Sequence, residues 1–192
     1  YVFLWYITLW IRIMSNLRLI NKTTISGSQS TTDITDVFSA DFDIYKIAIS
    51  GISTVGTTYT GLEIRMINSS GSVEEGASDY KFAYQLLAPN TSFAEEYDDS
   101  HNGFYRMLSI YTDQAPESMG MQAFMFNPFS STYFTTVIAQ NTSAYAGIFR
   151  QEKYYGIHKK AVSCTGIRIK EEEGDRPYNS GTVKIYGLKV DS

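Results

Sequence analysis

Short segments in which apolar and polar residues alternate place the strongest constraint on the fold of this chain. Near the C-terminal end, residues 165–169 read T-G-I-R-I and residues 181–189 read G-T-V-K-I-Y-G-L-K. In a β-strand this period of two puts the isoleucine and valine side chains on one face, and Arg168 or Lys184 on the other. The polar, turn-rich run 170–180 separates the two segments, so they predict an antiparallel hairpin that closes a β-sheet domain.

Alternating segments recur along the rest of the chain, and no stretch keeps an apolar helical repeat over three turns. Aromatic residues make up 15 % of the sequence, which favours strands because these rings fit a pleated, half-buried surface. The spacing of the segments is that of an all-β sandwich of short strands. The expected strands are residues 17–20, 25–32, 44–52, 57–68, 80–86, 104–110, 119–127, 133–140, 143–152, 161–170 and 181–190.

Each expected strand has a single apolar face, and packing one sheet on another is the stable way to bury such faces. We therefore predict an all-β fold of two packed antiparallel sheets. Residues 17–20 and 183–188 lie far apart in the sequence, but a sandwich allows them to pair as neighbouring strands.

The two ends of this region resemble a known family. The ending (G-I-R-I and, further on, S-G-T-V-K-I-Y-G-L) and the opening (F-S-A-D-F-D-I-Y-K-I-A-I-S-G-I) resemble the jelly-roll virion proteins of tailed bacteriophages. The similarity covers residues 17–52 and 165–188. Phe42 stands where that family usually has a tyrosine.

The resemblance implies a jelly roll on the particle surface: a capsid decoration, fibre or tail-appendage subunit that forms a symmetric homo-oligomer and binds other virion proteins. It brings no catalytic motif and no cofactor. The alternative fold is an immunoglobulin-type sandwich, although the chain lacks the paired cysteines of that fold and has no tryptophan after Trp10.

The first thirteen residues are nearly all apolar. The run is shorter than the roughly 20 residues that span a bilayer, and it lacks the cleavage site of a secretory signal. We expect residues 14–192 to form a single β-sandwich domain and no segment to cross a membrane. Two interpretations of residues 1–13 stay open: they precede a translation start at Met14, or they pack against a neighbouring subunit.

Charge and cysteine content exclude two further classes of protein. The formal net charge is −4 and the lysines and arginines are scattered, so the chain has no basic surface for direct binding of nucleic acid. Cys164 is the only cysteine, which excludes an intrachain disulfide framework. We expect Cys164 to be a small core residue rather than a reactive thiol.

Motifs for catalysis are absent from the sequence, so we predict that the chain is not an enzyme. It has no G-x-S-x-G elbow, no phosphate-binding glycine loop and no H-E-x-x-H. Its two histidines are His101 and His158. We expect residues 154–160 to form a loop, and we expect His158 within it to be solvated or to contact a neighbouring subunit.

The segment 89–101 reads as a polar, acidic loop. Its side chains include Glu95, Asp98, Asp99 and His101, which are the residue types that could hold a hard cation such as calcium. Their spacing does not match the calcium loop of an EF-hand. A solvated loop is therefore the preferred interpretation, and we predict neither a metal nor a cofactor.

Residues 119–129 are apolar on both alternating faces, which a strand needs only when both faces are covered. The second face could be covered by a neighbouring subunit or by another part of the same chain. The subunit interpretation predicts an interface built from Met121, Phe124, Phe126 and Phe129.

Tyrosines offer a second kind of binding surface, because an aromatic face packs on the apolar face of a sugar while the hydroxyl stays wet. The candidates for stacking on a glycan are Tyr111, Tyr154, Tyr155 and Tyr178. The sequence thus predicts a structural phage protein that acts by self-assembly and particle binding. The alternative is a carbohydrate-binding module or adhesin for host-surface glycans.

Overall fold

The computed structural model describes residues 16–55, 60–89, 93–110, 119–145, 148–172, 174 and 176–189. These residues form twelve β-strands and no helix. The strands are β1 (Leu17–Gln29), β2 (Thr31–Ile34), β3 (Ile44–Thr54), β4 (Thr60–Asn68), β5 (Tyr80–Leu87), β6 (Ala94–His101), β7 (Phe104–Ile110), β8 (Met119–Phe126), β9 (Thr135–Tyr145), β10 (Ile148–His158), β11 (Cys164–Glu171) and β12 (Tyr178–Leu188).

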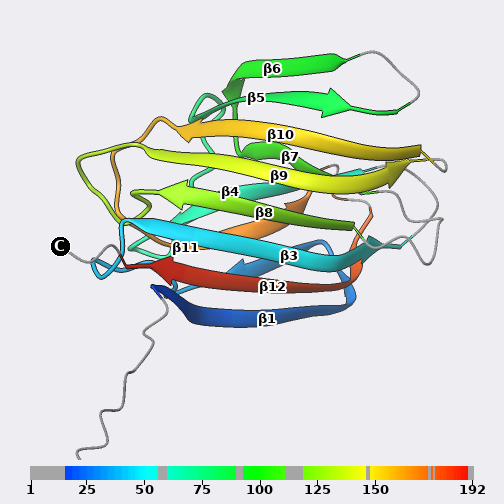
Figure 1. The fold of residues 1–192 in the computed structure, drawn as a ribbon. Helices are drawn as coiled ribbons and strands as arrows, with labels where there is room; N and C mark the ends of the chain where they lie inside the picture. The colour runs from blue at the N-terminus through cyan, green and yellow to red at the C-terminus, as the bar shows by residue number, and fades with distance from the viewer. Residues whose placement is uncertain are drawn as a thin grey trace, which may run out of the picture.

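All the strand pairs are antiparallel, and they form two sheets. The larger sheet has the order β1-β12-β3-β8-β9-β10-β5-β6, and the smaller one has the order β2-β11-β4-β7. In Figure 1 the larger sheet rises from β1 at the bottom to β6 at the top, with β4, β7 and β11 behind it. The predicted all-β, two-sheet antiparallel sandwich is confirmed.

The strand order is that of a jelly roll enlarged by two hairpins. The four strands β1-β12-β3-β8 face the four strands β2-β11-β4-β7, and the chain crosses from one sheet to the other at most steps. The hairpin β5–β6 is inserted between β4 and β7, and the hairpin β9–β10 between β8 and β11. Both hairpins join the larger sheet beyond β8. We call β1, β12, β3 and β8 the jelly-roll half of this sheet, and β9, β10, β5 and β6 its extension.

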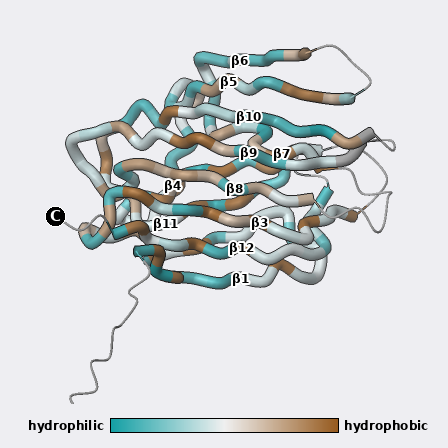
Figure 2. Tube along the Cα trace, in the orientation of Figure 1, coloured by the Kyte–Doolittle hydropathy of each residue, from teal (hydrophilic) through white to brown (hydrophobic). Residues whose placement is uncertain are grey.

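The core lies between the sheets and follows the alternation of the sequence. On β3 the inward residues Tyr45, Ile47 and Ile49 are buried, and on β12 Val183 and Ile185 are fully buried. Figure 2 shows the matching alternation of hydrophobic and hydrophilic residues along these strands. The predicted inward faces are confirmed.

The predicted pairing of the two ends of the sandwich is also confirmed. Strands β1 and β12 are hydrogen-bonded neighbours with Leu17 opposite Leu188. Gly27 and Ser28 have positive φ angles of 76° and 60°, where the register between these strands shifts. The chain therefore forms one long, irregular β1 followed by the short β2, rather than separate strands at 17–20 and 25–32.

The predicted C-terminal hairpin is wrong. Strand β11 lies in the smaller sheet between β2 and β4, whereas β12 lies in the larger sheet between β1 and β3. Ile167 and Ile169 therefore meet the core from the sheet opposite to Val183 and Ile185. The alternation correctly indicates which face of each strand is buried, but two strands with matching faces can pack across a core as well as pair side by side.

Two predicted loops are strands. Residues 94–101 form β6, which pairs with β5 at the edge of the larger sheet. Its charged side chains reach water, as is common for an edge strand. Residues 154–158 belong to β10, where Gly156 faces Phe104 so closely that a Cβ atom would lie 2.6 Å from the ring.

Residues 1–13 lie outside the described part of the chain, so both interpretations of them stay open. Within the described residues there is no helix of the length and hydropathy needed to cross a membrane.

Candidate functional site

A row of side chains crosses the outer face of the larger sheet, which is the face turned away from the smaller sheet. In every neighbouring pair of strands the register sets one member of this row opposite the next. We call it the transverse row. From β1 to β6 it consists of Leu19, Tyr186, Lys46, Phe124, Ile138, Tyr155, Ala83 and Tyr97.

The aromatic members of the transverse row recur on alternate strands, namely β12, β8, β10 and β6. Neighbouring strands lie about 4.8 Å apart, so alternate strands place these rings about 10 Å apart. Tyr97 and Tyr155 are the most open of the rings, with exposed fractions of 79 % and 50 %. The ammonium group of Lys46 lies 5.9 Å from the centre of the Phe124 ring.

The rows on either side of the transverse row differ in character. One neighbouring row is mostly apolar: Leu17, Leu188, Ile44, Phe126, Thr136, Ile157 and Lys81. The other row is mostly polar: Lys22, Lys184, Ala48, Gln122, Gln140, Lys153, Gln85 and Glu95. The outer face is thus divided into an apolar side and a side rich in amides and charges.

The apolar side is concentrated on the jelly-roll half and on β9. We call this group the apolar patch, and its members are Leu17, Leu19, Ile44, Phe124, Phe126, Ile138 and Leu188. Leu19 and Ile138 are about half exposed, at 50 % and 47 %. The solvent-facing side of an antiparallel sheet is usually polar, and a contiguous apolar surface indicates a binding site.

The predicted interface residues lie on both faces of the larger sheet, and only one of these faces is the surface of the molecule. Phe124 and Phe126 are half-buried on the outer face, within the apolar patch. Met121 lies in the core between the sheets. Phe129 follows β8 and packs against the edge of the core. Strand β8 is apolar on both sides because one side meets the core and the other forms part of the patch.

The predicted glycan-stacking tyrosines are also separated. Tyr155 is exposed on the outer face, whereas Tyr154 points inward and is buried. Tyr178 is fully buried and donates a hydrogen bond of 2.6 Å to the carbonyl of Lys170, so its ring has no face open to a sugar. Tyr111 lies outside the described residues. Two further tyrosines, Tyr97 on β6 and Tyr133, are exposed although the sequence did not single them out as candidates.

The four acidic-segment residues considered as metal ligands do not converge. Asp98 accepts a hydrogen bond from the backbone N–H of Ser100, and Asp99 lies 3.6 Å from the ammonium group of Lys81. The ring of His101 packs against Tyr105, with the ring centres 4.5 Å apart. Glu95 is exposed on the outer face.

Among the described residues, one group has the spacing of metal ligands: Glu74, Asp79 and His158. The ammonium group of Lys160 already lies 2.9 Å from a Glu74 carboxylate oxygen and 2.7 Å from an Asp79 oxygen. This cation lies between the two carboxylates and offsets one of their two negative charges. His158 is buried and stacks on Tyr80, and burial lowers the pKa of its imidazole to about 4.

A polar cleft lies on the inner side of the extension, beyond the last strand of the smaller sheet. Buried Glu152 accepts hydrogen bonds of 2.6 Å from the Ser109 hydroxyl and 2.7 Å from the Asn141 amide. Arg106 lies 2.8 Å from Glu172 and 3.5 Å from Glu96. The carboxylates named here all have partners, which is what a structural polar network requires.

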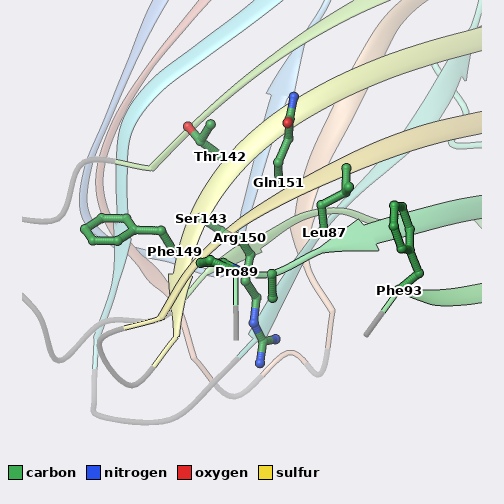
Figure 3. A pocket seen from close by; sticks show the side chains of 9 residues that line it. Leu87, Pro89, Phe93, Thr142, Ser143, Phe149, Arg150 and Gln151 are labelled. Atoms are coloured by element: carbon green, nitrogen blue, oxygen red, sulfur yellow. The ribbon is translucent and has the colours of Figure 1, made fainter. Parts of the chain in front are cut away.

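A second hollow, of about 450 Å³, lies at the end of β5, β9 and β10 (Figure 3). Figure 3 shows Leu87 and Phe93 close together on one side, whereas the Phe149 ring points away on the other. Its lining residues border the segments 90–92 and 146–147, which are outside the described part of the chain. The outer face of the sheet is therefore the better defined candidate surface.

Cys164 lies in the core, as expected of a small apolar residue. Burial raises the pKa of its thiol to about 12, so at neutral pH it is protonated and a poor nucleophile.

The chain matches no protein family model, no curated protein and no solved structure.

Proposed function

We propose that this chain is a structural subunit on the surface of a tailed-bacteriophage particle, where it self-assembles through the apolar patch. The observation that carries the proposal is the position of Phe124 and Phe126. They lie on one strand, on the outer face of the sheet, among Ile44, Ile138 and Leu188 from three neighbouring strands. This surface is of the kind that a second protein covers.

A second copy of the same chain is the proposed partner. Homo-oligomers with closed symmetry are the commonest assemblies of soluble proteins, and the same patch on two subunits can pack on itself. The half-buried rings and the aliphatic side chains form a continuous apolar centre. Lys22, Lys184 and Gln122 lie along one side of it and supply the polar rim that interfaces usually have.

The virion setting rests on the resemblance of the terminal segments to phage jelly-roll proteins. Its support from the fold is indirect: jelly rolls occur in viral capsid proteins and in lectins, and a fold alone does not specify a function. In this proposal the chain works by packing rather than by catalysis, in keeping with the buried, protonated thiol of Cys164.

The test replaces a patch residue with a charged one. Phe124→Asp and Phe126→Asp should each weaken self-association by roughly a hundredfold, because a carboxylate buried without a partner at an interface costs several kcal/mol. Sedimentation equilibrium measures the association, and circular dichroism checks that each variant stays folded. Ser50→Asp is the matched control, since Ser50 is exposed on the same outer face but lies beyond the polar row.

The control should associate like the native chain. If the native chain is monomeric at all concentrations, or if folded Phe124→Asp and Phe126→Asp variants associate as the native chain does, self-assembly through the patch is wrong.

A further inference from the structure

We propose that the outer face of the extension holds a saccharide-binding subsite between Tyr97 on β6 and Tyr155 on β10. The ligand is an uncharged oligosaccharide of at least three linked pyranose rings, lying across β6, β5 and β10. The subsite lies on other strands than the apolar patch and adjoins it where Tyr155 lies opposite Ile138, and it adds a binding activity to the assembly role.

The register places the two tyrosines on either side of a small residue. Tyr155 and Tyr97 are both directly opposite Ala83, which belongs to the strand between theirs. The methyl group of Ala83 leaves the space between the rings open, and a hollow of about 490 Å³ lies there. With exposed fractions of 79 % and 50 %, the side chains of Tyr97 and Tyr155 are open to solvent.

The spacing suits a carbohydrate chain. The two tyrosines are attached to alternate strands, about 10 Å apart, and this separation matches the distance from one pyranose ring to the second ring after it in an extended chain. A pyranose has an apolar C–H face that packs on an aromatic ring, and its hydroxyl groups remain at the rim, where they meet water or polar side chains. The two tyrosines can therefore stack on two pyranose rings that have one further sugar between them.

The polar row supplies partners for those hydroxyl groups on the same three strands. Lys153, Gln85 and Glu95 lie two residues from Tyr155, Ala83 and Tyr97 along their strands, and the register sets them opposite one another. They also line the hollow.

Together these three side chains offer ammonium, amide and carboxylate groups, which include both donors and acceptors of hydrogen bonds. Among the described residues, no ion pair involves Lys153 or Glu95. Their charges sum to zero. This balance complements a neutral, hydroxyl-rich ligand better than it complements a phosphate-bearing or acidic one.

The position of the subsite fits a role apart from assembly. It is built from hairpins that are inserted into the jelly-roll order, and β6 is the free edge of the larger sheet. A protein partner with an apolar surface would fit this site less well. The row that begins with Leu17 and is mostly apolar reaches β5 at Lys81, whose ammonium group lies 3.6 Å from Asp99.

The experiment uses the full chain in affinity electrophoresis through gels that contain soluble β-1,4-glucan, β-1,3-glucan, glycol chitin, mannan or bacterial O-antigen polysaccharide. At least one of these should retard the native chain. Tyr97→Ala and Tyr155→Ala should each lower the affinity for that polysaccharide at least tenfold, because each removes one stacking surface. Ala83→Arg keeps both rings but fills the space between them, and it should abolish the retardation.

Tyr133→Ala is the matched control, since Tyr133 is 66 % exposed and lies outside the hollow. It should be retarded like the native chain. Retardation by none of the polysaccharides, or retardation that survives in Tyr97→Ala, Tyr155→Ala and Ala83→Arg, would overturn the subsite. Either result leaves the Phe124→Asp test of self-assembly unaffected, so failures of the two proposals can be told apart.

Discussion

His158 packs in the core with its ring stacked on Tyr80, the ring centres being 4.6 Å apart. Among the described residues neither ring nitrogen has a hydrogen-bond partner. Burial therefore disfavours the imidazolium and lowers the pKa of His158 to about 4, even though the nearby carboxylates of Glu74 and Asp79 act in the opposite direction. The sequence suggested a solvated or subunit-contact residue, because residues 154–160 resemble a loop. The chain instead turns His158 inward in the last position of β10.

This environment predicts an acid-side loss of stability. Between pH 6.5 and about 4 the unfolded chain protonates His158 and the native chain does not, so the free energy of unfolding falls as the pH falls through this window. At about 1.4 kcal/mol for each unit of pKa, the loss amounts to about 3 kcal/mol. Urea unfolding at a series of pH values measures it.

The control variant is His158→Phe, which keeps a ring beside Tyr80 but cannot be protonated. Its stability should be flatter than that of the native chain over the same window. Glu74, whose pKa is lowered by hydrogen bonds from Lys160 and Asn68, adds a further loss that begins as the pH falls to its ordinary value of 4.5 and that the native chain and the variant share. Equal slopes for the native chain and the variant between pH 4 and 6.5 would show that His158 is not the source.

At the scale of strands, local alternation predicted which side chains face the core, and it was right for β3, β11 and β12. It did not predict which strands pair. The proposed partners at the C-terminal end, β11 and β12, lie in opposite sheets because partner choice depends on the whole topology. β6 was missed because its charged residues resemble a loop, and an edge strand can expose such residues on both faces.

The candidate site was only partly predictable for the same reason. Phe124, Phe126 and Tyr155 were found from composition and local pattern. The transverse row joins Leu19 to Tyr186 and onward across the sheet, so it exists only through the pairing of distant strands. No local sequence pattern marked Tyr97. It is a candidate for sugar stacking because β6 pairs with β5 and places Tyr97 opposite Ala83, on the same face as Tyr155.

Strand β12 allows a direct test of which face is buried. Ile185 is fully buried between the sheets, whereas the adjacent Lys184 is on the outer face. Ile185→Asp should therefore unfold the chain or lower its free energy of unfolding by about 4 kcal/mol or more, since it leaves a charge unpaired in the core. Lys184→Asp should change the same quantity by about 0.5 kcal/mol or less.

Chemical denaturation followed by fluorescence gives both values. A pair of variants with similar stability would mean that β12 does not present Ile185 to the core, and the sandwich described here would be incorrect at its closing strand.

At the scale of the whole molecule, the larger sheet divides its outer face between two roles. The jelly-roll half bears the apolar patch, which we assign to contacts between copies of the chain. The extension, formed by the inserted hairpins, bears the tyrosine pair at the free edge of the sheet. The patch extends onto β9, where Ile138 lies directly opposite Tyr155, so the two surfaces adjoin on neighbouring strands.

Cryo-electron microscopy of the native particle that contains this chain tests the central claim most directly, namely that the chain assembles through the apolar patch of its larger sheet. The account predicts many symmetry-related copies of the sandwich at the particle surface, with density from a neighbouring copy covering Phe124 and Phe126. Copies whose Phe124 and Phe126 face solvent while other surfaces make the contacts, or a chain found only as a free monomer, would contradict it.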